Sequence, residues 1–243
     1  MEKYYFEEHE KTYQEIKRDN LEAWDQYHDP TLYNFENFMM RPFLERALEF
    51  INVTSTDSTV FEYGCGTGAG ACFLANKGFT VDAIDISPTA IELAKSIALK
   101  RNLNINYTNK DLLEMTELNK EYDLILDNYC LQSLVTDGDR SKLYAIIKSG
   151  LKKSGYYIIS SAMYDEQRSY GENTYYCGDT SIVYDRIISP GPYNETIMIN
   201  NEWWKPKRRH LKTEALSEEL KSNGFLILLQ ENGNIVCKKN DIR

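Results

Sequence analysis

An acidic residue followed by glycines at alternate positions is the first place in this chain where the residue types point to chemistry. Glu62 follows the apolar pair Val60-Phe61, and glycines stand at positions 64, 66 and 68. This pattern predicts a strand that stops in a loop, where the absence of side chains lets another molecule approach the backbone closely. A loop of this kind between a strand and a helix is typical of the ligand-binding edge of an open α/β sheet and indicates a nucleotide-like ligand.

Three further carboxylates end the strands expected after this loop. Asp85, Asp111 and Asp127 each close an apolar or β-branched run. A carboxylate at the carboxyl end of a strand accepts hydrogen bonds from both hydroxyls of a ribose. The alternative for Asp85 is a cap of the helix that starts at Ser87-Pro88, and Asp111 has the same alternative at the turn that follows it.

These features together resemble the class I S-adenosylmethionine-dependent methyltransferases, over residues 60–161. The most specific element is Glu62-Tyr63-Gly64-Cys65-Gly66-Thr67-Gly68. The resemblance implies an α/β fold: a Rossmann-like seven-stranded sheet in the order 3-2-1-4-5-7-6, with its last strand antiparallel and helices on both faces. It also implies S-adenosylmethionine as cofactor and S-adenosylhomocysteine as product.

An NAD-dependent oxidoreductase is the alternative from another class of enzyme. Gly64, Gly66, Ala69 and an acidic residue 21 positions after Gly64 also fit the dinucleotide fingerprint. That fingerprint does not account for Glu62 or Gly68. A third hypothesis is a cofactor-binding module without catalysis.

The resemblance implies roles for single residues at the adenosine end of the cofactor. Asp85 accepts hydrogen bonds from the ribose hydroxyls, and Ile86 packs on the adenine. Asp111 and Leu112 bracket the edge of the same base. An apolar residue beside a ribose-binding carboxylate suits this role because it covers the face of the purine.

At the amino-acid end, the resemblance brings Gly64 and Gly66 close to the methionine part and the ribose, and Asp127 or Asn128 near the amino group. Residues of the N-terminal segment are expected to reach the carboxylate, although an ion pair at the surface is the alternative for Arg41. The full expected cofactor set is Glu62, Gly64, Cys65, Gly66, Asp85, Ile86, Asp111, Leu112, Asp127, Asn128, Tyr33 and Arg41.

The segment after the fourth strand indicates the class of acceptor. Residues 127–134 contain no proline, unlike the motif of methyltransferases that act on the amino groups of nucleic-acid bases. The segment is more similar to small-molecule methyltransferases, but Gln132 stands where those enzymes place a histidine. We therefore expect a small-molecule acceptor and in-line methyl transfer that depends mainly on positioning and desolvation.

The candidates for a catalytic base are Tyr129, His28 and His210, and structural roles are the alternative for both histidines. The expected substrate contacts are Tyr129, Gln132, Trp203 and Trp204. The two tryptophans have the alternative of packing on a sheet from a hairpin arm. No metal is expected, because the fifth strand ends in Ser160-Ser161 and not in carboxylates.

Periodicity and breakers predict the elements that position these residues. The expected helices cover 4–20, 34–51, 70–77, 89–100, 140–151 and 213–223, and the expected strands cover 59–63, 80–85, 105–111, 122–127, 156–161, 225–230 and 235–239. We expect one domain made of a helical cap (1–55), a cofactor-binding core (56–162), a β-rich flap (163–211), and a C-terminal helix with a closing strand pair (212–243). The first helices either cover the mouth of the sheet or pack on its side.

Composition limits the partners. The net charge is −9, and the first fifty residues contain twelve acidic and six basic side chains, which disfavours a nucleic-acid partner. The five cysteines are scattered and indicate neither a disulfide framework nor a zinc site. With no apolar run long enough to span a bilayer and no signal peptide, we expect a cytoplasmic protein without a membrane partner, as a monomer or homodimer.

Overall fold

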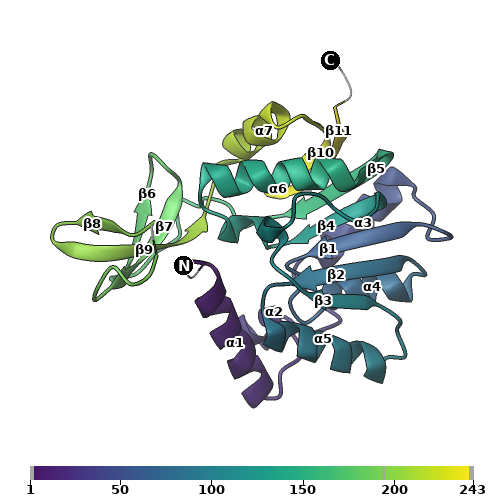
Figure 1. Ribbon diagram of the computed structural model, residues 1–243, viewed down its shortest axis with the longest axis horizontal. Helices are drawn as coiled ribbons and strands as arrows, with labels where there is room; N and C mark the ends of the chain where they lie inside the picture. Colours follow the sequence, from purple (N-terminus) through teal and green to yellow (C-terminus); the bar gives the residue numbers. More distant parts are fainter. Residues whose placement is uncertain (1–2, 194, 241–243) are drawn as a thin grey trace.

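A seven-stranded sheet organises the chain, of which the computed structural model describes residues 3–193 and 195–240. Its order is β10-β11-β5-β4-β1-β2-β3 (Figure 1). The strands are β1 (Thr59–Tyr63), β2 (Thr80–Asp85), β3 (Asn106–Asn109), β4 (Tyr122–Asn128), β5 (Leu151–Ser160), β10 (Phe225–Glu231) and β11 (Asn234–Lys239). β11 is antiparallel to both β5 and β10, whereas β1 to β5 are parallel. The predicted order 3-2-1-4-5-7-6 with an antiparallel last strand is therefore confirmed.

Helices cover both faces of this sheet. They are α1 (Phe6–Arg18), α2 (Trp24–His28), α3 (Arg41–Ile51), α4 (Ala69–Asn76), α5 (Pro88–Lys100), α6 (Asp137–Gly150) and α7 (Thr213–Ser222), with single turns η1 (Leu112–Glu114) and η2 (Leu131–Ser133). In β1, Val60 packs with the residues of α3, α4 and α5, whereas its neighbour Phe61 packs with those of α6 and α7. This alternation follows from the two-residue period of a strand that is buried on both faces.

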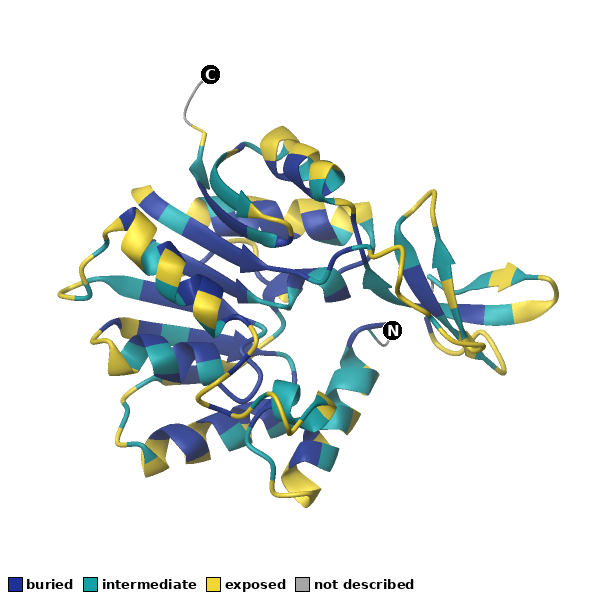
Figure 2. Ribbon diagram, turned by 180° about the vertical axis from the view of Figure 1, so that it is seen from behind, coloured by how far each residue is buried: buried dark blue, intermediate teal, exposed yellow. Residues whose placement is uncertain are grey.

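A second sheet, in the order β6-β7-β9-β8, projects from one side of the main sheet (Figure 1). It consists of β6 (Thr174–Cys177), β7 (Ile182–Ile187), β8 (Ile197–Ile199) and β9 (Glu202–Arg209), all antiparallel. Most of its residues are only half-buried or exposed, unlike the central strands (Figure 2). The expected β-rich insertion is confirmed, and Asn200-Asn201 form the turn of the hairpin between β8 and β9.

Two predicted boundaries are wrong for local reasons. The helix predicted from 34 begins only at Arg41, because the Asn34 side chain accepts hydrogen bonds from the Glu36 and Asn37 N–H groups and forms a turn. The predicted start of the fifth strand at 156 is also too late. β5 begins at Leu151 and includes Gly155, where a Cβ atom would lie 2.9 Å from the Tyr122 carbonyl oxygen.

The N-terminal helices divide between the two expected positions. α3 packs on a face of the main sheet through Phe43, Leu44 and Ala47. α1 lies at the carboxyl ends of the strands, between the main sheet and the projecting sheet (Figure 1). Only α1 and α2 therefore contribute residues to the site.

Candidate functional site

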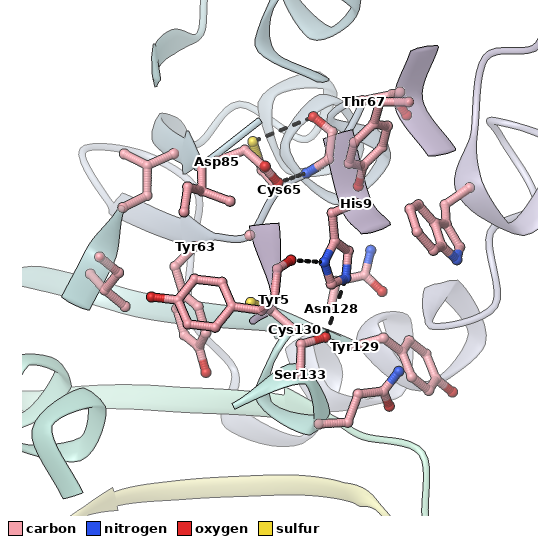
Figure 3. A pocket seen from close by; sticks show the side chains of 18 of the residues that line it. Tyr5, His9, Tyr63, Cys65, Thr67, Asp85, Asn128, Tyr129, Cys130 and Ser133 are labelled. Carbon is pink, nitrogen blue, oxygen red and sulfur yellow. Dashed lines mark hydrogen bonds between the residues drawn. The ribbon is translucent and has the colours of Figure 1, made fainter. Parts of the chain in front are cut away.

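A cavity at the carboxyl ends of β1, β2 and β4 contains most of the residues predicted for the site (Figure 3). It holds about 1150 Å³ of empty space, including its open mouth, which is enough for a nucleotide-sized ligand with a second small molecule. Ten of the predicted residues line it: Gly64, Cys65, Gly66, Asp85, Ile86, Asp111, Leu112, Asn128, Tyr129 and Gln132.

The glycine loop passes tightly between its neighbours. Gly64 and Gly66 have φ of +58° and +55°, which residues with a side chain rarely adopt. A Cβ atom on Gly64 would collide with the Cys130 side chain, and one on Gly66 would collide with the Tyr13 hydroxyl. Glycine is therefore required by both the backbone conformation and the space.

Asp85 fixes the same loop. Its Oδ2 accepts a hydrogen bond of 2.8 Å from the Gly66 N–H, and its Oδ1 accepts one of 2.8 Å from the Ser87 N–H. The helix cap is Ser87, whose hydroxyl accepts from the Ala90 N–H, so Asp85 is not needed as the cap. Burial raises the pKa of the Asp85 carboxyl to about 6, against the lowering influence of these backbone donors. Each carboxylate oxygen keeps a lone pair that can accept another hydrogen bond.

Asp111 has the capping role that was its alternative reading, and its contact with the adenine stays a prediction. Its Oδ1 accepts from the Leu113 N–H and caps η1, while its Oδ2 accepts a 2.9 Å hydrogen bond from the Tyr5 hydroxyl. Lys3 lies 3.7 Å from the same oxygen. Asp111 therefore joins the edge of the sheet to the start of α1.

Glu62 and Asp127 are fully buried behind the cavity wall and do not line it. Neither oxygen of Glu62 meets a donor in hydrogen-bonding geometry among the described residues. Burial raises the pKa of Glu62 to about 8, opposed by the Ala71 N–H. Burial also raises the pKa of Asp127, to about 7.

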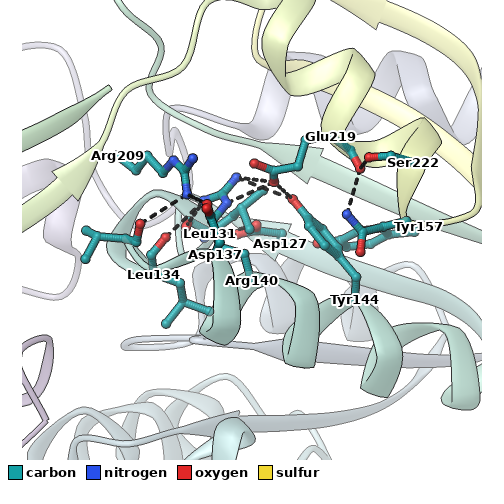
Figure 4. A network of polar contacts seen from close by, with 12 residues as sticks. Asp127, Leu131, Leu134, Asp137, Arg140, Tyr144, Tyr157, Arg209, Glu219 and Ser222 are labelled. Atoms are coloured by element: carbon teal, nitrogen blue, oxygen red, sulfur yellow. Dashed lines mark hydrogen bonds and ion pairs between the residues drawn. The ribbon is translucent and has the colours of Figure 1, made fainter. Parts of the chain in front are cut away.

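Asp127 belongs to a polar network that holds the segment after β4 (Figure 4). Its carboxylate accepts hydrogen bonds from the Cys130 and Leu131 N–H groups and from the Tyr63 hydroxyl. Arg140 of α6 donates hydrogen bonds to the carbonyl oxygens of Leu131 and Leu134 in the same segment, at 2.9 and 3.0 Å.

The arginine is itself paired with Glu219 of α7 at 2.7 Å, and the Tyr144 hydroxyl donates to the same carboxylate. This network gives the cavity wall at Asn128–Leu134 a rigid support. Tyr129 on that wall has a left-handed backbone, with φ of +62°. The Gln132 side chain is held by the Ala162 N–H at 2.5 Å.

Six other predicted residues lie away from the cavity lining: Tyr33, Arg41, His28, His210, Trp203 and Trp204. Arg41 pairs with Glu45 at 3.0 Å, as its alternative reading expects. His210 lies at the base of the projecting sheet, where it contacts Arg168 and Tyr170. The roles predicted for these six residues stay predictions, because none of the six lines the cavity.

Helices over the mouth of the sheet were one of the two expected arrangements, but the residues that form the roof of the cavity were not predicted. The roof comes from α1, α2 and β9, and its residues are Tyr5, His9, Tyr13, Ala23, Trp24, Asp25 and Arg208. β9 fastens α1 through opposite charges: Arg208 contacts both oxygens of Glu8 at 3.1 and 3.3 Å, and Lys207 lies 3.8 Å from Glu8. Residues 7–8 are acidic and the run 205–209 is basic. These opposite charges were the only feature of the sequence that could have indicated a contact between α1 and β9.

The comparisons with known proteins agree with this geometry. Residues 60–155 match the family described as "Methyltransferase domain". This match, called the methyltransferase domain below, covers β1 to β4 and the start of β5. The main sheet has the strand order of the class I methyltransferase fold. This methyltransferase domain carries every strand-end residue of the site, whereas the roof comes from outside it.

Two curated methyltransferases each match about half of this chain. The chain is 27% identical over 113 residues to a 2-heptyl-1-hydroxyquinolin-4(1H)-one methyltransferase of Mycobacteroides abscessus, covering 46% of this chain and 50% of that protein. It is 28% identical over 130 residues to a ubiquinone biosynthesis O-methyltransferase of Rickettsia akari, covering 54% of this chain and 50% of that protein. The chain thus spans about half the length of the curated relatives it matches.

A solved structure extends the likeness in fold beyond the methyltransferase domain. The 1,6-didemethyltoxoflavin-N1-methyltransferase of Burkholderia thailandensis, solved with 1,6-didemethyltoxoflavin and S-adenosylhomocysteine, has a TM-score of 0.62 at 16% identity, covering 96% of this chain and 87% of that one. No helix within residues 3–193 and 195–240 is long and apolar enough to cross a membrane. In the same residues, no three His, Cys, Asp or Glu side chains are grouped so that they could hold a metal ion.

Proposed function

We propose that this protein transfers a methyl group from S-adenosylmethionine to a small-molecule acceptor. The observation that carries the proposal is the cavity that joins the glycine loop, Asp85 and Ile86 to the segment after β4. The methyltransferase domain and the named activities of its relatives support it. The antiparallel β11 also differs from the strand order 3-2-1-4-5-6 of dinucleotide-binding folds, which disfavours an oxidoreductase.

The residues present fit the cofactor. Asp85 is fixed by two backbone donors and still has lone pairs for a ribose diol, and Ile86 beside it offers an apolar surface to adenine. Gly64, Gly66 and Asn128 also line the cavity, where the amino-acid part of the cofactor is expected. When bound, the cofactor supplies an electrophilic methyl group on a sulfonium.

The protein's own contribution is to align the two reactants and to exclude water. The rigid wall at Asn128–Leu134 fixes one side of the acceptor space, and α1 covers the other. Alignment of this kind supplies much of the rate when the leaving group is already good. The names of the hydroxyquinolone and toxoflavin enzymes give acceptors that contain rings. Acceptors of this kind suit the aromatic lining at Trp24 and Tyr129.

Calorimetric titration with S-adenosylhomocysteine tests the cofactor assignment. Asp85→Asn is expected to weaken binding about 10–100-fold, because hydrogen bonds to a charged acceptor contribute roughly 1.5–3 kcal/mol each. The matched control is Asp82→Asn on the same strand, since Asp82 points to Lys120 and Tyr122 instead of the cavity. No binding by the wild type would remove the proposal, and binding without turnover of any acceptor would leave a non-catalytic binding module.

The expected division into cap, core, flap and C-terminal segment stays a prediction. The same holds for the cytoplasmic location and for the choice between monomer and homodimer.

A further inference from the structure

An imidazole from outside the methyltransferase domain enters the cavity opposite the segment after β4. His9 lies on α1, and its Nε2 is 3.4 Å from the Ser133 hydroxyl oxygen (Figure 3). Its Nδ1 contacts the carbonyl oxygen of Tyr5, one helical turn earlier. His9 therefore faces the wall where the acceptor is expected.

These two contacts define which nitrogen carries the proton. A carbonyl oxygen only accepts hydrogen bonds, so Nδ1 must be the N–H donor in its contact with Tyr5. Nε2 then has a free lone pair in the neutral ring, and the Ser133 hydroxyl is able to donate to it. The ring is thus oriented as a proton acceptor toward the cavity.

The surroundings keep this ring neutral. Burial, the nearby Arg208 and Lys205 on the same strand together lower the pKa of His9 to about 4. Glu8 on α1 has the opposite influence but is itself paired with Arg208. Asp25 of α2 also lines the cavity. At neutral pH the His9 ring is therefore uncharged, and the lone pair of its Nε2 is not occupied by a proton.

Two aromatic side chains, Trp24 and Tyr129, line the cavity together with His9. The Trp24 ring lies 5.4 Å from the imidazole at an interplanar angle of 33°, and Tyr129 and Leu134 line the same cavity. Aromatic walls of this kind bind planar rings through stacking contacts. An acceptor that fits this lining has a ring beside these side chains and a hydroxyl on its edge toward Nε2.

We propose that His9 is the general base that takes the proton from a ring hydroxyl of a planar aromatic acceptor. This inference rests on the proposed function. The acceptor oxygen forms a bond to the methyl carbon while the carbon–sulfur bond breaks and its electron pair stays on sulfur. The hydroxyl proton goes to Nε2 of His9 and from there to solvent, so no oxidant or further reactant is needed.

The kinetic test uses 4-hydroxyquinoline and catechol as probes, with S-adenosylmethionine as donor and S-adenosylhomocysteine formation as readout. The wild type is expected to methylate at least one probe, and His9→Gln is expected to lower kcat about 100-fold or more, in the range of general base catalysis. In His9→Gln the remaining rate should rise about tenfold per pH unit below the pKa of the probe hydroxyl, because only the ionised probe then reacts. The wild-type rate should rise less steeply.

Lys11→Gln is the matched control on the same helix, because Lys11 is exposed and does not line the cavity. It should keep the wild-type kcat. Calorimetry should give the same affinity for S-adenosylhomocysteine, within about threefold, in the wild type and both variants, which shows that the fold is intact. If His9→Gln loses its affinity for S-adenosylhomocysteine, the kinetic test is made with His9→Asn instead.

A readout without turnover comes from nitrogen-15 NMR of the imidazoles. The His9 signals, assigned by their loss in His9→Gln, should show a neutral ring with the proton on Nδ1 at pH 6.5. A proton on Nε2, an unchanged kcat in His9→Gln, or wild-type protein that binds S-adenosylhomocysteine but methylates neither probe would overturn this inference alone. Wild-type protein that does not bind S-adenosylhomocysteine would overturn the proposed function as well.

Discussion

The floor and the roof of the cavity are built on different principles. The floor consists of strand ends and tight loops, and its polar groups are bonded to nearby backbone: Asp85 to Gly66 and Ser87, and Asp127 to Cys130 and Leu131. The roof consists of α1, α2 and β9, which are held by side chains from distant parts of the sequence, such as Glu8 with Arg208.

This difference matters for how each part responds to change. The hydrogen bonds of the floor, from backbone N–H groups to buried carboxylates, form with the fold and are protected from solvent. Ion pairs near the surface are individually weak and are screened by salt. We therefore expect the floor to determine stability and cofactor affinity, and the roof to determine access and acceptor binding.

The largest expected effect concerns the support of the floor. Arg140 is 2% exposed and pairs with Glu219, so Arg140→Met leaves a poorly solvated carboxylate and frees two carbonyl groups. Breaking a buried pair from one side costs about 3–5 kcal/mol. Urea unfolding measures this loss, and Arg186→Met, in the exposed pair with Glu202, is the control with a loss below about 1 kcal/mol.

Next in size is a substitution at the contact between floor and roof. Gly66→Val places a branched side chain at φ of +55° and against the Tyr13 hydroxyl. We expect the affinity for S-adenosylhomocysteine to fall more than about 100-fold, because both strain and lost space act at the binding loop. Gly138→Val is the control, since no atom lies within 4 Å of its Cβ position. Equal affinities of the two variants would contradict a closely approached loop.

A third test uses the buried acid of the floor. The pKa of Glu62 is raised to about 8, so the folded protein holds a proton that the unfolded chain releases near its ordinary pKa. The stabilisation is present at low pH and is lost as the pH rises toward 8.

Between pH 6.5 and 8 the wild type should lose up to about 2 kcal/mol more than Glu62→Gln, at roughly 1.4 kcal/mol per pH unit. His9, His210 and Asp127 also change protonation on unfolding in this window, because burial lowers the pKa of both histidines to about 4 and raises that of Asp127 to about 7. Both proteins contain these three groups, so the difference between the two pH curves reports Glu62. Parallel pH curves for the two proteins, measured by urea unfolding, would show that Glu62 is ionised when folded.

The smallest expected effect is on the charges that hold the roof. Glu8→Gln removes the partner of Arg208 and Lys207, and we expect S-adenosylhomocysteine affinity to fall only about 2–5-fold, as for partly exposed ion pairs. The loss should shrink at 1 M salt, because the Debye length there is about 3 Å. Calorimetry at low and high salt measures both values. A loss as large as that of Gly66→Val would make the roof as important for the cofactor as the floor.

Most of the fold and the floor of the site could be predicted from the sequence. The glycines, the strand-end acids and the Ser87-Pro88 helix start are local signals, because the same residues that bind or cap also set the backbone. Secondary-structure boundaries were wrong where a side chain changed a turn, as at Asn34.

The roof depends instead on contacts across long stretches of chain. His9 and Arg208 are 199 positions apart in the sequence and line one cavity only because β9 returns beside α1. A histidine on an amphipathic helix carries no local signal that distinguishes a cavity residue from a surface one. The search for a base among His28, His210 and Tyr129 therefore omitted the one histidine that faces the cavity.

By itself the sequence determined the order of the main strands and the binding loop, because periodicity, glycine and acidic strand ends act through neighbouring residues. Only the tertiary structure decided that the carboxylates of Glu62 and Asp127 lie behind the wall, and that α1 covers the cavity. The physical reason is that burial and long-range pairing depend on which elements meet, and this is set by the packing of the whole chain.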